Sequence, residues 1–124
     1  MEQAIQKNWQ WVEAQACQFL SQQGLHLIKK NYASRWGEID LIMKDNSSLV
    51  FIEVRQRKNI KYGSSEESIT IHKQKKIIKT AYDYLQQDLI YNMDSDIRFD
   101  VICSNQKVEK QTEKLKFNWI KNAF

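Results

Sequence analysis

Two carboxylates, Asp40 and Glu53, lie in two short apolar segments separated by a turn-like sequence. The segments, Gly37–Ile42 and Val50–Arg55, are rich in β-branched and large apolar residues, which is typical of β-strands. Between them, Asp45–Ser48 contains residues whose side chains bond the local backbone in turns. The pattern predicts a β-hairpin with one carboxylate on each strand.

The register of this hairpin can be counted from the turn. If Asp45 faces Ser48, as it does for a loop of either two or four residues, Asp40 lies opposite Glu53, with Cβ atoms roughly 4.5–5.5 Å apart. Two like charges at that separation destabilise a sheet. A divalent cation would remove this penalty, and Mg²⁺ is commonly held by one or two carboxylates together with phosphate oxygens. The hairpin predicts a metal site, with a charge-decorated solvent face as the alternative.

The same register sorts the other side chains onto two faces. One face is wholly apolar and suits a buried sheet surface: Ile39, Leu41, Met43, Val50, Ile52 and Val54. The other face holds Asp40 and Glu53, with Glu38 opposite Arg55 beside them. Three apolar residues share that second face (Ile42, Leu49 and Phe51) and make it too apolar for a surface in water.

Hydrophobic periodicity predicts the elements around the hairpin. A first helix is expected from about Gln3 to Gln23, and an edge strand over Leu25–Tyr32. A second helix is expected to end at about Gln87, and its start is either the capping-box sequence at Ser64 or Thr70 slightly later. The side chains that this helix is expected to bury are Ile77, Ile78, Ala81, Tyr82 and Leu85.

Two further strands are expected after the second helix. Arg98–Cys103 predicts a strand with Phe99, Val101 and Cys103 inward, and with Arg98 and Asp100 on one face, where they can pair. A weaker strand is expected around Lys114–Phe117. The order α-β-β-β-α-β predicts an α/β fold with a mixed sheet flanked by helices.

Length and composition indicate one globular domain. The chain has 124 residues, of which 42% are hydrophobic and 27% charged, so residues 1–124 can form a single core. No apolar run approaches the length of a membrane helix, and Met1–Gln10 has no apolar signal region, so no membrane partner is expected. Cys17 and Cys103 lack metal-ligand spacing, and free core thiols indicate a cytoplasmic protein.

The positive charge is concentrated in one part of the chain. The net charge is +4, but residues 55–79 carry +6 and the remainder −2. Because this basic stretch follows directly from Glu53, it favours a nucleic-acid backbone lying across the carboxylates. A solvated lysine-rich helix and loop would have the same composition.

These residues resemble a known family. Asp40 followed by Glu53-Val54-Arg55 matches the motif of the PD-(D/E)XK, or restriction-endonuclease-like, superfamily. More closely, the chain resembles the bacterial YraN-like family, which is similar to archaeal Holliday junction resolvases. The matching stretches follow one another along nearly the whole chain: Glu13 with Phe19-Leu20, Gly37–Ile42, Val50–Arg57, the helix containing Lys73, Arg98–Val101 and Asn122–Phe124.

The resemblance implies a fold and a chemistry. The fold is a restriction-endonuclease-like core with a mixed sheet of four to five strands and flanking helices. The chemistry is a phosphodiesterase site that depends on Mg²⁺, with Mn²⁺ as a substitute. Asp40 and Glu53 carry over as metal ligands, with the Val54 carbonyl as a third. Glu13 matches the helical glutamate of the resolvase-like branch.

One position departs from the superfamily pattern, which has lysine where this chain has Arg55. Arginine stays charged and cannot act as a general base, but its planar fork can grip a phosphate oxygen. Glu13 or Gln56 is then expected to orient the attacking water. The residues expected to contact the nucleic-acid backbone away from the chemistry are Arg57, Lys58, Lys61, Lys73 and Lys76.

The expected function is a Mg²⁺-dependent endonuclease that hydrolyses phosphodiester bonds of DNA, branched or damaged, in repair or recombination. RNA stays open as a substrate, and a homodimer is implied by the resolvase resemblance alone. The alternative is a non-catalytic or weakly catalytic nucleic-acid-binding module on the same fold, with its catalysis weakened by Arg55. The intact pair of Asp40 and Glu53 favours the enzyme.

Overall fold

The computed structural model describes residues 2–56, 69–87, 94–104 and 115–124 of the chain. Its elements follow the order α-β-β-β-α-β-β, which confirms the expected mixed α/β fold, with the weaker C-terminal strand present as the fifth of the sheet. Within these ranges, no helix is both long and apolar enough to cross a membrane. The elements are α1 (Glu2–Gln22), β1 (His26–Ser34), β2 (Gly37–Asp45), β3 (Ser48–Gln56), α2 (Ile71–Gln87), β4 (Asp96–Ser104) and β5 (Phe117–Ile120).

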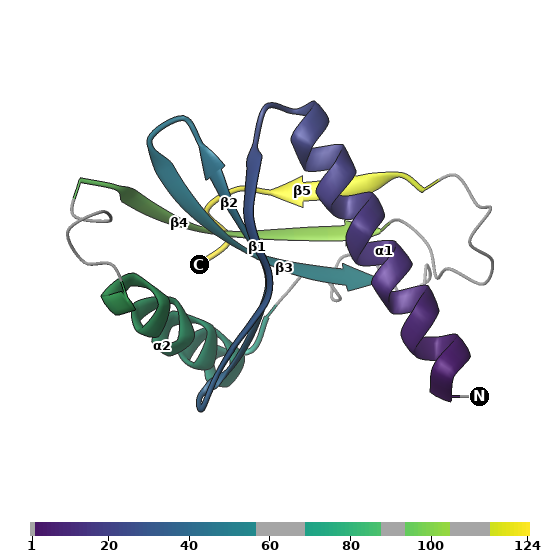
Figure 1. Ribbon diagram of the computed structural model, residues 1–124, viewed down its shortest axis with the longest axis horizontal. Coiled ribbons are helices and arrows are strands. Elements are labelled where there is room, and N and C mark those ends of the chain that lie inside the picture. Colours follow the sequence, from purple (N-terminus) through teal and green to yellow (C-terminus); the bar gives the residue numbers. More distant parts are fainter. Residues whose placement is uncertain (1, 57–68, 88–93, 105–114) are drawn as a thin grey trace.

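The strands form one mixed sheet in the order β1-β2-β3-β4-β5. β3 and β4 are parallel, and every other neighbouring pair is antiparallel. β1 lies at an edge, as the sequence predicts. Figure 1 shows that β1 and β2 run steeply across the direction of β3, β4 and β5. The sheet is therefore strongly twisted between β2 and β3, the two strands that carry the predicted carboxylates.

The first helix ends in a Schellman motif that also starts the sheet. Gly24 has a positive φ of 100°, and its N–H bonds the Ser21 carbonyl at 3.1 Å. The Leu25 N–H bonds the Leu20 carbonyl, also at 3.1 Å. Glycine adopts this left-handed backbone without a Cβ clash. Because Leu20 and Leu25 are both buried in the same cluster, the motif fixes the angle at which the chain leaves α1 for β1.

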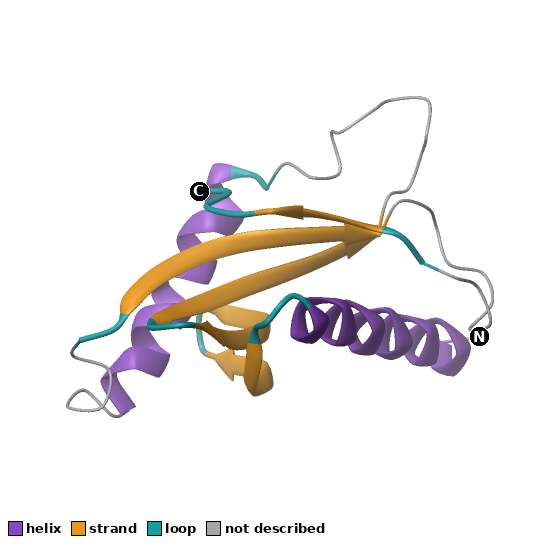
Figure 2. Cartoon of the chain, turned by 90° about the horizontal axis from the view of Figure 1, so that it is seen from above, coloured by secondary structure: helices purple, strands orange, loops and turns teal. Residues whose placement is uncertain are grey.

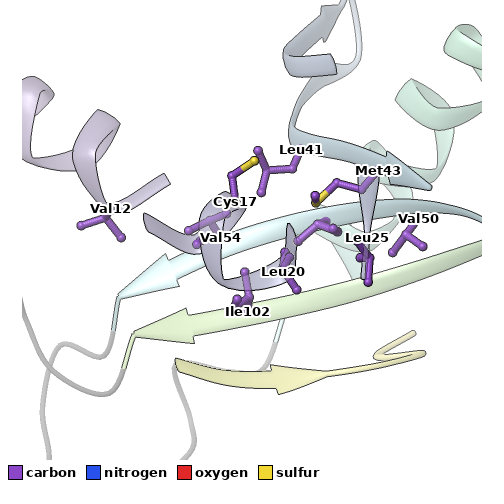
Figure 3. Close-up of a cluster of buried hydrophobic side chains, with 11 residues drawn as sticks. Val12, Cys17, Leu20, Leu25, Leu41, Met43, Val50, Val54 and Ile102 are labelled. Carbon is purple, nitrogen blue, oxygen red and sulfur yellow. The ribbon is translucent and has the colours of Figure 1, made fainter. Parts of the chain in front are cut away.

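Each face of the sheet is covered by one helix. On the first face, α1 contributes residues such as Val12 and Leu20, which pack with Val54 and Ile102 of the sheet (Figure 3). On the second face, α2 packs through Ile77 and Ala81 in a cluster that contains Phe51. In Figures 1 and 2 the two helices lie apart, with strands between them. β3 is accordingly buried on both faces, from Leu49 to Val54.

Several residues differ from the expected inward and outward pattern. Tyr82, expected to be buried, is 53% exposed, and Ile78 and Leu85 are only half-buried. Thr80 is fully buried, and its hydroxyl donates to the Lys76 carbonyl at 2.9 Å.

Ile39 was expected on the face of Leu41. It packs instead with Phe51, Ile77 and Ala81 in the cluster beneath α2, which we call the α2-side cluster. The alternation of side chains breaks between Ile39 and Leu41 because β2 no longer pairs with β3 there.

The structure confirms one expected element boundary and moves another. The second helix begins at Ile71, so the Thr70 start is confirmed, and Ser64 lies outside the described residues. The Thr70 hydroxyl accepts a bond from the Lys73 N–H at 3.2 Å, as an N-cap does. The weak strand expected around Lys114–Phe117 is displaced to Phe117–Ile120, where it pairs with β4.

Candidate active site

The predicted carboxylate pair lies where β2 separates from β3. The two strands pair from Asp45 opposite Ser48 to Leu41 opposite Ile52, which confirms the counted register. Asp40 and Glu53 are the next residues along that register. At this point the Val54 N–H donates a 2.8 Å hydrogen bond to Asp40 Oδ2. The Asp40 carboxylate thus accepts the hydrogen bond of a β3 backbone N–H just beyond the last paired residues of β2 and β3. We call this place, where the two strands separate at Asp40 and Glu53, the fork.

A cavity of about 470 Å³ opens at the fork. Its wall is formed by residues of both helices and of three strands. The cavity therefore forms only when α1 and α2 are both packed on the sheet, each on its own face. Four of its lining side chains are carboxylates, drawn from α1, β2 and β3. The lining residues are Trp9, Gln10, Glu13, Asn31, Glu38, Asp40, Glu53 and Lys73. The structure therefore brings Glu13, Asp40 and Glu53 together, three residues that the sequence predicts to act jointly.

Asn31 of β1 connects two of these carboxylates. With its amide nitrogen turned toward them, it donates to Glu13 Oε2 and to Glu38 Oε1, each at 2.9 Å. This orientation is assigned from the partners, since the opposite one would aim the amide oxygen at two acceptors. Asn31 has a positive φ of 52°, a left-handed conformation that asparagine tolerates. It lies between the partner pairs Lys30–Leu41 and Tyr32–Ile39, at the level of Asp40.

The environment of the cavity disfavours negative charge. Burial, followed by the neighbouring charge of Glu53, raises the pKa of Asp40 to about 8. Burial, followed by the charge of Glu38, raises the pKa of Glu13 to about 7. Desolvation and like charges both favour the protonated form of a carboxyl. A cation bound here would reverse that preference, so the cavity is suited to a positively charged ligand.

Lys73 reaches the cavity from the first turn of α2. Its ammonium Nζ lies 2.6 Å from Glu53 Oε1, and the Glu53 side chain is 9% exposed. The sequence places Lys73 on the nucleic-acid backbone away from the chemistry. The structure places it against one of the two expected metal ligands instead.

The other expected site residues lie in different surroundings. Arg55 and Gln56 end β3 and are half-buried, and neither is among the described residues that line the cavity. Val54 is buried, and its carbonyl stays a predicted ligand. Lys76 is exposed on α2. The remaining three expected backbone contacts, Arg57, Lys58 and Lys61, lie outside the described residues.

The donor set fits a hard cation that keeps water or substrate ligands. In the described part of the chain, no three or more His, Cys, Asp or Glu side chains are grouped to hold a metal by themselves. Asp40 and Glu53 are therefore a two-carboxylate set. Mg²⁺ is typically bound by one or two carboxylates, with water and phosphate oxygens completing the octahedron. The structure fits that kind of ion better than zinc or calcium, which take more protein ligands.

Sequence reasoning assigned no role to Asn31, although a signal was present. β1 and β2 are joined at Ser34 opposite Gly37, so the same counting that placed Asp40 opposite Glu53 places Asn31 opposite Asp40. Counting requires both strand ends, and the expected strand stopped at Tyr32. Glu38 also lines the cavity, and the sequence had placed it beside the carboxylate pair without a role. Trp9 and Gln10, the remaining unassigned lining residues, have no comparable signal in the sequence.

Comparison with known proteins gives a consistent family. The sequence profile described as "Uncharacterised protein family UPF0102" matches residues 12–103. A UPF0102 protein of Acinetobacter baumannii (strain AYE) is 45% identical over 123 residues, covering 93% of this chain and 92% of the relative. A UPF0102 protein of Legionella pneumophila (strain Corby) is 44% identical over 119 residues, covering 96% of this chain and 95% of the relative.

Proposed function

The chain belongs to the UPF0102 family, and from that premise we propose that it is a Mg²⁺-dependent endonuclease that hydrolyses phosphodiester bonds of DNA. The proposal includes membership of the PD-(D/E)XK superfamily and a likeness to resolvases, with branched or damaged DNA as the substrate in repair or recombination. The observation that carries it is the fork, where Asp40 and Glu53 adjoin in a cavity with two further carboxylates.

Asp40 and Glu53 lie side by side at the fork, an arrangement of like charges that binding to DNA alone does not require. Asp40 is held in place by the Val54 N–H, so one of its oxygens is fixed while the pair stays in the cavity wall. Placing like charges together costs folding free energy unless a cation joins them. A bound Mg²⁺ would neutralise this charge, acidify a water molecule and polarise the phosphate. Asp40, Glu53 and the Val54 carbonyl are the groups that would hold it.

Glu13 is suited to receive the proton of the attacking water. In the metal-free protein its pKa is raised to about 7 by burial and by the charges of Glu38 and Glu53, and a bound cation would lower that pKa and favour the carboxylate form that a general base requires. The Asn31 amide bonds Glu13 Oε2 and so orients the carboxylate within the cavity. Arg55 and Gln56, which do not line the cavity, stay predictions for phosphate binding and water orientation.

The surface beside the cavity favours a polyanionic substrate. Three exposed lysines follow Lys73 along α2: Lys75, Lys76 and Lys79. Lysine ammonium groups attract the phosphates of a DNA backbone whatever the base sequence, so these residues are suited to bind that backbone. A bound strand would then lie along α2 with one phosphate at the fork.

The test is cleavage of linear, single-stranded and four-way-junction DNA in Mg²⁺ or Mn²⁺. We expect the wild type to cut at least one of them, and Asp40→Asn or Glu53→Gln to lower the rate by roughly 10³-fold or more, since each removes a charge from the metal site. Asp96→Asn is the matched control, because Asp96 is exposed and pairs with Ser48, at the far end of β3 from Glu53.

Two outcomes would overturn the proposal that the protein is a nuclease. Cleavage that survives Glu53→Gln would point to a contaminating nuclease. Tight DNA binding without cleavage in either metal would instead support the non-catalytic binding module. Calorimetric titration with Mn²⁺ separates these cases further, because a binding module has no need for a metal affinity that Asp40→Asn abolishes.

A further inference from the structure

Lys73 is the one basic side chain among the described residues that line the cavity, and it faces four carboxylates there. Its ammonium pairs with Glu53 at 2.6 Å. The two partners differ in exposure: the Glu53 side chain is 9% exposed, whereas that of Lys73 is 48% exposed. The carboxylate is therefore fixed in the wall, and the ammonium is at the end of a flexible stem that reaches water.

The position of Lys73 is set by a firmly anchored helix start. The Thr70 hydroxyl caps the Lys73 N–H, and the Gln74 N–H bonds the Thr70 carbonyl at 2.9 Å. The Gln74 side-chain amide bonds the Ile69 carbonyl at 2.8 Å, and Ile69 is buried in the α2-side cluster. These bonds fix the backbone of the turn from which Lys73 extends, and its side chain reaches Glu53 from that turn.

The charge at the fork leaves Lys73 two competing positions. A divalent ion on Asp40 and Glu53 would compete with the ammonium for Glu53, because both cations are attracted to the same carboxylate. The released ammonium would stay within reach of the cavity, since its helix is anchored. A phosphate bound at the ion is an anion that it could then meet there, beside the carboxylates of Glu13 and Glu38. Arg55, at the motif position, does not line the cavity and so does not occupy this place.

We propose that Lys73 shares Glu53 with the divalent ion: its ammonium holds the carboxylate in the metal-free protein and, when the ion binds, moves to the phosphate that is being cleaved. The sharing of Glu53 rests on the observed ion pair alone. The move to the phosphate rests in addition on the proposed function. No covalent step is involved. Lys73 neutralises charge at two places in turn.

The first measurement is a calorimetric titration of the intact chain with Mn²⁺ in the absence of DNA. Lys73→Met keeps the length of the aliphatic stem but removes the competing charge. We expect it to bind Mn²⁺ roughly three- to tenfold more tightly than the wild type, the effect of one partly exposed ion pair. Lys121→Met is the matched control, since Lys121 is exposed just after β5, at the sheet edge opposite β1, and it should leave the Mn²⁺ affinity unchanged.

The second measurement is the steady-state cleavage of the best DNA substrate. Lys73→Met should lower kcat by roughly 10²-fold while KM changes little, because a charge that acts on the reacting phosphate stabilises the transition state more than the bound substrate. Lys73→Arg keeps the charge and should restore part of kcat. A lysine that contacts only distant backbone would instead raise KM and leave kcat unchanged.

The outcomes distinguish this inference from the proposed function. An Mn²⁺ affinity that is the same in Lys73→Met and the wild type overturns the sharing of Glu53. A raised KM with unchanged kcat overturns the move to the phosphate. If Lys73→Met tightens Mn²⁺ binding but the wild type cuts no DNA, the shared carboxylate is supported, whereas the nuclease and the move to the phosphate both fail.

Discussion

Asp40 in β2 is half-buried and Asp100 in β4 is fully buried, and the chain supplies these two carboxylates with very different partners. Asp100 is fully buried and receives hydrogen bonds from the Arg98 guanidinium, the Trp119 indole at 3.0 Å and the Asn122 N–H at 3.0 Å. Asp40 receives the Val54 N–H and otherwise faces other carboxylates. The pairing of Arg98 with Asp100 was an expectation from the sequence, and the structure confirms it.

This contrast separates a structural carboxylate from a functional one. The charge of Asp100 is balanced within the chain, so its site is complete in the folded protein. The charge of Asp40 is opposed by its surroundings, so its site is completed by a ligand from outside. Asp40 is half-buried and Asp100 is fully buried, but this difference in burial does not distinguish an incomplete site from a complete one. The number and sign of the groups that face the carboxylate do.

The largest effect on stability is expected at the complete site. Asp100→Ala removes the acceptor of three donors, Arg98, Trp119 and Asn122, and leaves Arg98 with Asp45 as its remaining carboxylate. Breaking a buried ion pair in this way typically costs about 3–5 kcal/mol of unfolding free energy. Urea denaturation measures this loss, which should be the same with and without Mg²⁺. Asp96→Ala on the same strand is exposed and should change stability by less than about 0.5 kcal/mol. A loss below about 1 kcal/mol for Asp100→Ala would contradict the comparison.

The opposite sign is expected at the incomplete site. Asp40→Asn keeps an oxygen for the Val54 N–H but removes one of two adjoining charges. We expect the metal-free protein to gain about 1–2 kcal/mol at pH 8, because like-charge repulsion and desolvation of a carboxylate are both relieved. The stabilisation of the wild type by Mg²⁺ should disappear in this variant. A destabilised Asp40→Asn protein would mean that Asp40 is as well partnered as Asp100.

The pH dependence sharpens the same comparison. The pKa of Asp40 is about 8 in the folded chain and 3.8 for the unperturbed group, so the folded state keeps a proton that the unfolded state has lost. Stability contributed by that proton is present below about pH 4 and is lost as the pH rises toward 8. The advantage of Asp40→Asn over the metal-free wild type should therefore be small at low pH and grow toward pH 8.

Urea denaturation of both proteins across this range, with the metal removed by chelation, gives the measurement. Taking the difference between the two proteins cancels the titration of carboxylates that do not interact with Asp40, so the remaining change reports Asp40 together with its neighbours Glu13, Glu38 and Glu53. An advantage that stays constant with pH would show that Asp40 is ionised throughout, as expected for a carboxylate that is fully paired.

The smallest effect is expected at Asn31, which supports the incomplete site from β1. Asn31→Gly removes the amide between Glu13 and Glu38 but accepts the positive φ of 52° without strain. We expect cleavage to fall by roughly three- to tenfold, because Glu13 loses the group that orients it, while unfolding free energy changes by about 1 kcal/mol or less. An unchanged cleavage rate, measured on the substrate that the wild type cuts, would remove Asn31 from the site.

Much of the fold follows from local patterns. The hairpin register was countable because a short turn and alternating apolar residues leave one solution, and the structure confirms it from Asp45 to Leu41. Ile39 was misplaced because the counting assumed that pairing continues beyond the fork. Tyr82 was misplaced because helical spacing does not tell where the sheet beneath α2 ends. Both errors concern long-range geometry, which periodicity does not contain.

The candidate site shows the same division. The carboxylates of the hairpin lie on adjacent strands, so the sequence could place Asp40 beside Glu53. Glu13 was added through resemblance, and the structure brings it into the cavity. The location of Lys73 was not predictable, because it depends on where α2 begins and on how that helix crosses the sheet. Its partner, Glu53, is twenty residues away in the sequence and on a different element.

The hydrogen bond from Val54 to Asp40 makes one backbone amide a reporter of the whole site. Its proton is held by a side chain rather than by a neighbouring strand, at 2.8 Å. Protonation of Asp40, or engagement of its carboxylate by a cation, changes the strength of that single bond. In an NMR spectrum, the amide resonance of Val54 should therefore follow the ligation state of the cavity, and its exchange with deuterium should record how often the fork opens.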